Sequence, residues 1–140
     1  MTPTQIAAVQ KSFAQVVPIK DAAAALFYER LFETDPSARA LFKGDMAEQG
    51  KKLMAAIAMV VGGLTNLSAL LPAIRNMARR HAGYGVQDGH YDSVGQALLW
   101  TLEQGLGPAF TPDVREGWAA AYTILATAMM DAAKDAQVAA

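Results

Sequence analysis

Apolar residues recur at spacings of three and four along almost the whole chain, and no stretch alternates between apolar and polar residues. Spacings of three and four place side chains on one face of an α-helix, whereas a period of two is typical of strands. The pattern therefore predicts an all-α fold. It predicts six main helices, over residues 3–16, 18–34, 47–64, 69–82, 88–106 and 112–133, and a short one that ends near residue 42.

Residues that start helices mark several of these boundaries. Thr2-Pro3 with Gln5 combines an N-cap hydroxyl, a first-turn proline and a capping-box partner, and the same chemistry recurs at Thr111-Pro112. Asp35-Pro36 is predicted to cap the short helix and to reset the chain direction. The alanine-rich tail from Ala132 is expected to fray.

Composition and charge narrow the class of protein. A chain of 140 residues is the length of one ordinary domain, and 53% hydrophobic content is enough for a core that also encloses a large apolar cofactor. The net charge is −1, from 12 Lys and Arg against 13 Asp and Glu, and the basic residues form small pairs. We therefore expect no nucleic-acid partner. The chain has no cysteine, which excludes disulfides, thiolate metal sites and a cysteine nucleophile.

The N-terminus shows no basic region followed by an apolar core, so we expect no secretion signal. No apolar run reaches the roughly 18 to 20 residues that span a bilayer. These features favour a cytoplasmic protein with no membrane partner.

The most informative single residue is His81. It ends an apolar helical stripe that includes Ile74, Met77 and Ala78, and the helix-breaking run 83–85 follows at once. An imidazole directed inward from a helix is either a hydrogen-bonded core residue or a ligand to something held in the core. The stripe alone leaves both interpretations open.

Residues elsewhere in the chain favour the ligand interpretation. Phe27-Tyr28 lies in a predicted helix, Phe42 follows a short turn, and Gln49 and Leu53 lie four apart on one face of the next helix. Together with His81 they make a pocket for a flat ligand. The full pattern consists of Tyr28, Phe42, Gln49, Leu53, Arg79-Arg80-His81, Gly85-Val86 and His90-Tyr91. It resembles the globin family, and more narrowly the single-domain bacterial haemoglobins and the globin module of flavohaemoglobins. The resemblance implies a globin fold over residues 1–140, as one domain, with a haem pocket between helices.

By this resemblance His81 is the axial ligand of a haem iron, and the only metal ligand of the chain. We expect haem b, because no cysteine pair is available for covalent attachment. His90 lies beside Asp88 and Gly89 at the start of the next helix, and is expected to be a surface or capping residue.

On the opposite side of the haem, the resemblance makes Tyr28 and Gln49 the residues that contact a bound diatomic gas. A hydroxyl or amide donor in a dry pocket favours dioxygen over carbon monoxide. Tyr28 could instead be a core aromatic whose hydroxyl is satisfied elsewhere. Gln49 could face solvent at the mouth of the pocket.

Most of the other residues that the resemblance assigns to haem binding are apolar. The residues expected to form the walls of the haem pocket could instead be ordinary core residues. Phe42 is expected to stack on the macrocycle. The expected wall residues are Leu53, Ile57, Met77, Val86, Val94 and Leu98, and the expected partners of the propionates are Lys52, Arg79 and Arg80.

Tyr91 resembles the family tyrosine that approaches the axial histidine. In flavohaemoglobins a glutamate on the last helix completes a histidine, tyrosine and glutamate network. The matching place here falls near Ala133, and the closest acid, Asp131, is shorter and off register. We therefore do not expect the complete network.

Four functions remain open from the sequence. The first is reversible binding of dioxygen for storage or delivery, with nitric oxide and carbon monoxide as further ligands. The second is nitric oxide dioxygenation with a separate reductase, since no glycine-rich dinucleotide segment follows the globin. A gas sensor would need an output domain, and a haem-free helical interaction module would be colourless.

Overall fold

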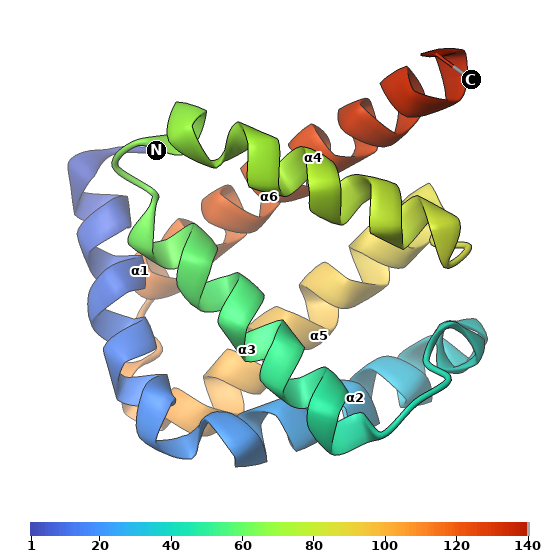
Figure 1. The fold of residues 1–140 in the computed structure, drawn as a ribbon. Helices are drawn as coiled ribbons and strands as arrows, with labels where there is room; N and C mark the ends of the chain where they lie inside the picture. The colour runs from blue at the N-terminus through green and yellow to red at the C-terminus, as the bar shows by residue number, and fades with distance from the viewer. Residues whose placement is uncertain (140) are drawn as a thin grey trace.

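The computed structural model describes the backbone of residues 1–139 and the side chains of residues 1–134. Within the described chain every regular element is helical, so the predicted all-α fold is confirmed. The described chain contains six α-helices, whose arrangement Figure 1 shows. They are α1 (Pro3–Val16), α2 (Lys20–Thr34), α3 (Met46–Gly62), α4 (Leu67–Gly83), α5 (Asp88–Leu106) and α6 (Pro112–Ala139), with short 3-10 turns η1 (Val17–Ile19), η2 (Pro36–Leu41) and η3 (Gly107–Ala109).

The start of α1 has the predicted capping box. The Thr2 hydroxyl accepts a hydrogen bond from the Gln5 amide at 3.1 Å, and the Gln5 side chain accepts one from the Thr2 amide at 2.9 Å. At the start of α6 the Thr111 hydroxyl likewise accepts from the Val114 amide, at 3.4 Å. These bonds satisfy amides that have no partner inside the helix.

The structure differs from the sequence prediction at the second and short helices. Residues 17–19 form a 3-10 turn, so α2 begins at Lys20 rather than near Pro18. The Asp35 side chain does not cap η2. Its carboxylate instead accepts hydrogen bonds from the Ser37 hydroxyl and, at 2.8 Å, from the Ser93 hydroxyl on α5.

Helix α6 is longer than the predicted range of residues 112–133. Helix α6 continues to Ala139, and Figure 1 shows its red end extending past α4. Alanine has the highest helix propensity of the twenty residues, so an alanine-rich segment can extend a helix that is already anchored by packing.

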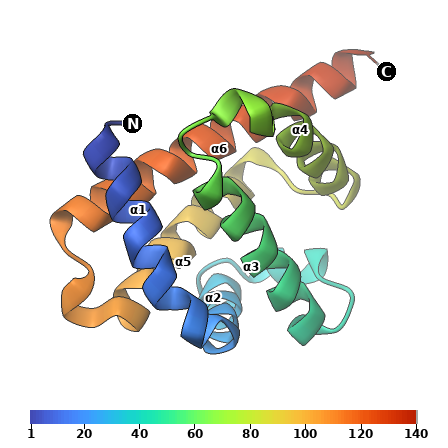
Figure 2. The same cartoon turned by 60° about the vertical axis from the view of Figure 1, so that its left-hand side comes forward.

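Helix α4 packs mainly against one other helix. Helix α4 packs chiefly on α6, α2 packs on α3 and α5, and α1 packs on α6. Figure 2 shows α1 and the end of α4 on opposite sides of the molecule, with α2 nearly end-on below α3.

The buried apolar residues form three clusters. The first joins α1, α2, α3, α5 and α6 and includes Val9, Ala24, Leu102 and Trp118. The second is built on Phe27, Tyr28, Leu31, Ala38 and Ala97, and the third on Ile74, Met77, Ala78 and Met129. The second and third clusters have no member in common. The core is therefore interrupted between α4 and the pair α2 and η2.

Gly95 sets the close approach of α5 and α6, because a Cβ atom there would lie 2.8 Å from Cε2 of Tyr122. The Tyr122 ring is held in place by its hydroxyl, which donates to the Tyr91 carbonyl at 2.7 Å. We predict that Gly95→Ala lowers the free energy of unfolding by about 1–3 kcal/mol, the usual effect of overpacking. Urea unfolding followed by circular dichroism measures this change.

Gly89→Ala is the matched control, because a Cβ atom there would meet no other atom within 4 Å. It should leave the stability unchanged or raise it by up to about 1 kcal/mol, since alanine is the better helix former. Equal stability of the two variants would contradict the steric role of Gly95.

Candidate functional site

His81 lies in the last turn of α4 and is half-buried. Its Nδ1 atom is 2.7 Å from the Met77 carbonyl oxygen. A carbonyl oxygen only accepts hydrogen bonds, so Nδ1 carries a proton, and in the neutral imidazole Nε2 then keeps its lone pair. This is the tautomer in which a histidine binds a metal through Nε2, with its second nitrogen held by a backbone oxygen.

The loop after α4 is tied back to His81. The Val86 amide donates to the His81 carbonyl at 3.1 Å, which closes the loop over the end of the helix. Gly85 has a φ of 94°, a left-handed conformation that favours glycine. A side chain at Gly85 would point towards Leu41 of η2. The loop therefore lies beside η2, and Val86 is half-buried there.

His90 is a capping residue, as predicted. Its Nδ1 accepts a hydrogen bond from the Gln87 amide at 2.9 Å, which completes a capping box at the start of α5. Its Nε2 lies 3.4 Å from the Ser37 hydroxyl. Both ring nitrogens of His90 are thus engaged, whereas His81 has one that is not, and the chain contains no other histidine.

Tyr28 lies on α2, buried among aromatic rings. Its ring centroid is 5.1 Å from those of Phe27 and Phe42, both in edge-on geometry. Its hydroxyl donates to the Gln49 backbone carbonyl at 3.1 Å. Burial raises the pKa of Tyr28 to about 12, so the phenol stays neutral at physiological pH.

Gln49 stands next to Tyr28 because α2 and α3 approach closely. A Cβ atom at Gly50 would lie 3.0 Å from the Cβ of Ala24, so only glycine permits this spacing without adjustment. The approach brings the first turns of α3 onto α2, and the side chain of Gln49 is half-buried.

The predicted wall residues fall in different clusters. Phe42, Leu53, Val94 and Leu98 are half-buried at the edge of the second cluster, beside Tyr28. Met77 is buried in the third cluster, where Tyr91 packs at the edge. Ile57 packs against the first cluster, and with Leu53 and Leu98 it lines an apolar cavity of about 10 Å³.

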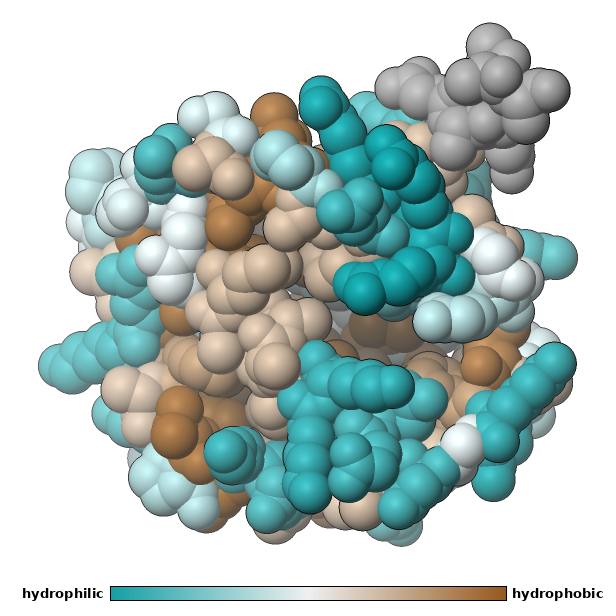
Figure 3. Space-filling model, viewed as in Figure 1, coloured by the Kyte–Doolittle hydropathy of each residue, from teal (hydrophilic) through white to brown (hydrophobic). Residues whose placement is uncertain are grey.

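The interruption of the core is visible at the surface. Figure 3 shows a hollow right of centre, with brown, apolar atoms at its floor and teal, hydrophilic side chains above and below it. Comparison with Figure 1 places it between α3, the C-terminal half of α4 and η2. We call this hollow the pocket. The second apolar cluster, on the α2 side, has the half-buried edge residues Phe42, Leu53, Val94 and Leu98.

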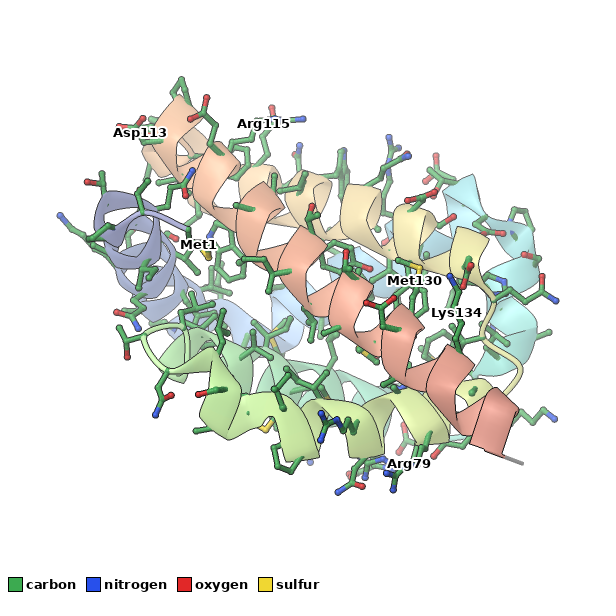
Figure 4. The ribbon with its side chains drawn as sticks, turned by 90° about the horizontal axis from the view of Figure 1, so that it is seen from above. Met1, Arg79, Asp113, Arg115, Met130 and Lys134 are labelled. Carbon is green, nitrogen blue, oxygen red and sulfur yellow. The ribbon has the colours of Figure 1, made fainter. Side chains whose placement is uncertain are left out.

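Cationic side chains lie on the helices that border the pocket. Lys52 on α3 and Arg79 and Arg80 on α4 are all exposed. Figure 4 shows Arg79 projecting outward from α4, on the side away from α6. None of the three forms an ion pair with a carboxylate in the part of the chain that the structure describes.

Tyr91 is held by a residue that the sequence analysis did not assign to the site. The Tyr122 hydroxyl of α6 donates to the Tyr91 backbone carbonyl, and burial, with a smaller effect of Asp88, raises the pKa of Tyr91. Asp131 is exposed. Among the described residues no carboxylate bonds to the Tyr91 hydroxyl, and the incomplete network stays a prediction. Tyr122 gave no sequence signal, because a tyrosine in an apolar helix looks like any core aromatic.

Comparisons with known proteins identify the family. A model of the globin family matches residues 25–129. The flavohemoprotein of Vibrio cholerae is 36% identical over 108 residues, which are 75% of this chain and 27% of that protein, and the neuroglobin of Danio rerio is 33% identical over 118 residues, 74% of each chain. The chain therefore belongs to the globin family. It spans only about a quarter of the length of the flavohemoproteins that it matches.

Two solved structures have the same fold. A bacterial globin from Campylobacter jejuni has a TM-score of 0.86 at 26% identity, covering 97% of this chain and 99% of its own. An engineered carbene transferase, made from a candidate nitric oxide dioxygenase of Rhodothermus marinus, also has a TM-score of 0.86, at 33% identity, covering 99% and 95%. The fold is thus the globin fold, and the protein is a haem globin. No helix among residues 1–139 is both long and apolar enough to cross a membrane.

Ionisation of Tyr28 should be visible in the pH dependence of stability. Its pKa is raised from an ordinary value of 10.0 to about 12 on folding, so the unfolded chain loses this proton first. The associated stability is present below pH 10 and is lost as the pH rises towards about 12. We predict that urea stability falls more steeply over this range in the wild type than in Tyr28→Phe. Equal pH dependence of the urea stability in the wild type and in Tyr28→Phe would contradict the burial of the phenol.

Proposed function

We propose that the protein binds haem b through Nε2 of His81 and binds dioxygen reversibly. The observation that carries this proposal is the hydrogen bond from His81 Nδ1 to the Met77 carbonyl, at 2.7 Å, which in the neutral imidazole leaves the lone pair of Nε2 free to bind a metal. Bound haem supplies an iron with one coordination position open to a small gas. We also propose that residues 1–140 form a single globin domain that acts in the cytoplasm.

The residues present fit a haem. The macrocycle is flat and apolar, and the pocket lies where the second and third apolar clusters fail to meet. Most of the binding energy would come from burying that apolar surface. Lys52, Arg79 and Arg80 would face the propionates at the rim, and exposed pairs of this kind contribute only about 0–1 kcal/mol.

Each remaining wall residue has a defined task in this proposal. Phe42 would lie against the macrocycle, while Leu53, Ile57, Val94 and Leu98 would keep water from the gas side. Met77 and Val86 would pack on the His81 side, and Tyr91 would approach the imidazole. The Met77 carbonyl orients the imidazole ring and makes Nε2 a better electron donor.

Replacing His81 tests the axial assignment. His81→Ala should lose haem on gel filtration, together with the visible absorption band, because no other side chain of α4 offers an uncommitted nitrogen lone pair. His90→Ala is the control: it removes a capping contact, and its haem content should stay at the wild-type level. If His81→Ala retains haem and His90→Ala loses it, His81 is not the axial ligand.

Tyr28 is the proposed donor to dioxygen, with Gln49 secondary. A hydrogen bond to a partly charged acceptor contributes about 1.5–3 kcal/mol, but the single Tyr28 proton already serves the Gln49 carbonyl, and giving up that bond costs about 0.5–1.5 kcal/mol. The net contribution of Tyr28 to dioxygen binding is therefore near the lower end of the range of about 1.5–3 kcal/mol.

Tyr28→Phe should therefore speed dioxygen release by roughly tenfold, which corresponds to about 1.4 kcal/mol, and change carbon monoxide release much less. Stopped-flow ligand replacement measures both rates. Phe32→Leu, a change in the neighbouring ring that removes no donor, is the control. Equal acceleration for the two gases would show that Tyr28 acts by packing alone.

A second candidate function is nitric oxide dioxygenation, with a separate reductase. The observation that favours it is the likeness to flavohemoproteins and to the candidate nitric oxide dioxygenase of Rhodothermus marinus. Nitrate forms from one nitric oxide, one dioxygen and one electron. The residues named above would admit both gases, and a separate protein would supply the electron.

We predict that the reduced, air-equilibrated 140-residue protein forms one nitrate per haem from added nitric oxide and then stops, even with NADH present. Each further nitrate needs an electron, which NADH delivers efficiently only through a flavin or a similar carrier. A nitric oxide electrode and ion chromatography of nitrate measure this. Continuous consumption with NADH alone would contradict the need for a partner.

A further inference from the structure

The basic residues are distributed unevenly along the chain. Residues 49–87 contain five of the 12 Lys and Arg side chains and none of the 13 Asp and Glu side chains. Three of the five, Arg75, Arg79 and Arg80, lie on α4, which contains no acidic residue. A protein with a net charge of −1 thus has a positive region on the helix that carries His81.

The α4 arginines share the solvent side of the helix. Arg75 and Arg79 are four residues apart and therefore lie one turn apart on the same face. The opposite face, with Ile74 and Ala78, is buried against α6. No arginine of α4 pairs with a carboxylate of the described residues, and Arg79 bonds only to the Asn76 side chain, at 3.4 Å.

The basic face ends at an exposed aromatic residue. Tyr84 follows α4 and is 63% exposed, the largest exposed fraction among the exposed large hydrophobic side chains. Its ring centroid is 6.4 Å from that of His81. Tyrosine and arginine are the residues most enriched at the centres of protein interfaces. We call the surface of Arg75, Arg79, Arg80 and Tyr84 the α4 face.

We propose that the α4 face docks the acidic surface of a one-electron donor protein. The proposal rests on the separate reductase of the proposed function. Arg75 would supply the charge that steers and orients the donor, because Arg79 and Arg80 face the propionates in the proposed function. Tyr84 would be the apolar contact at the edge nearest His81. In the step itself the donor is oxidised by one electron and the ferric globin is reduced by one, with no bond made or broken in the protein.

A charge reversal at Arg75 tests the docking surface, because Arg75 is exposed and has no part in the proposed haem contacts. The probe is an acidic [2Fe–2S] ferredoxin. Titrating its oxidised form into the ferric, haem-loaded globin measures binding without electron transfer, and stopped-flow with the reduced form measures the rate of reduction.

Arg115→Glu is the matched control. It makes the same change in charge at another exposed arginine, and Figure 4 shows Arg115 near the start of α6, far from Arg79. At about 20 mM salt, Arg75→Glu should weaken binding and slow reduction roughly tenfold, and Arg115→Glu less than about twofold. The difference should vanish at about 0.5 M salt, where exposed charges are screened.

Tyr84→Ala should weaken binding at both salt concentrations, because its contact is apolar. Circular dichroism checks that each variant is folded, and absorption spectra check that it contains haem. If Arg75→Glu disturbs folding, Arg75→Gln replaces it in the same measurements. Equal effects of Arg75→Glu and Arg115→Glu, or no effect of either, would overturn the proposal.

A second result would also overturn the proposal: Arg75-dependent binding to phosphatidylglycerol vesicles together with ferredoxin binding that does not depend on Arg75. That result would indicate that the α4 face binds an anionic membrane surface instead. Failure of the proposed function has a different signature. A protein that forms no nitrate from nitric oxide can still show Arg75-dependent binding of the oxidised ferredoxin.

Discussion

The packing of α4 on α6 determines the rest of the site. Ile74, Met77 and Ala78 bury the inner face of α4 against that one helix, and the end that carries His81 has no comparable support from α3. Were α4 to pack on α2 and α3 as well, the second and third apolar clusters would merge. Because they do not, the second cluster keeps half-buried apolar residues at its edge, among them Phe42, Leu53 and Val94.

The other side of the pocket depends on the spacing of α2 and α3. Gly50 lets α3 approach Ala24 on α2, and this approach brings the Gln49 carbonyl within reach of the Tyr28 hydroxyl. The same bond that satisfies a buried phenol also commits its only proton. Tyr28 therefore supports α3, and the donor role proposed for it would compete with that task.

Much of the architecture follows from local sequence. The helices, the capping box of Thr2 and the place of His81 at the end of an apolar stripe are all set by residues within a few positions of one another. The contact from Tyr28 to Gln49 and the bond from Ser93 to Asp35 join residues 21 and 58 positions apart. No local pattern specifies such pairs, because they depend on how the helices cross. The length of α6 was underestimated because alanine was interpreted as a sign of a loose end, although it is the strongest helix former.

The bond from Ser93 to Asp35 closes a loop of the chain that contains both α3 and α4, the two helices that border the pocket. Widening the pocket at its outer edge by moving the start of α5 away from η2 must break this bond. A diatomic gas needs no such movement, because displaced side chains are enough to admit it. A macrocycle needs the whole edge to open. Passage of a macrocycle at this edge would therefore break the Ser93 to Asp35 bond, whereas passage of a gas would leave it intact.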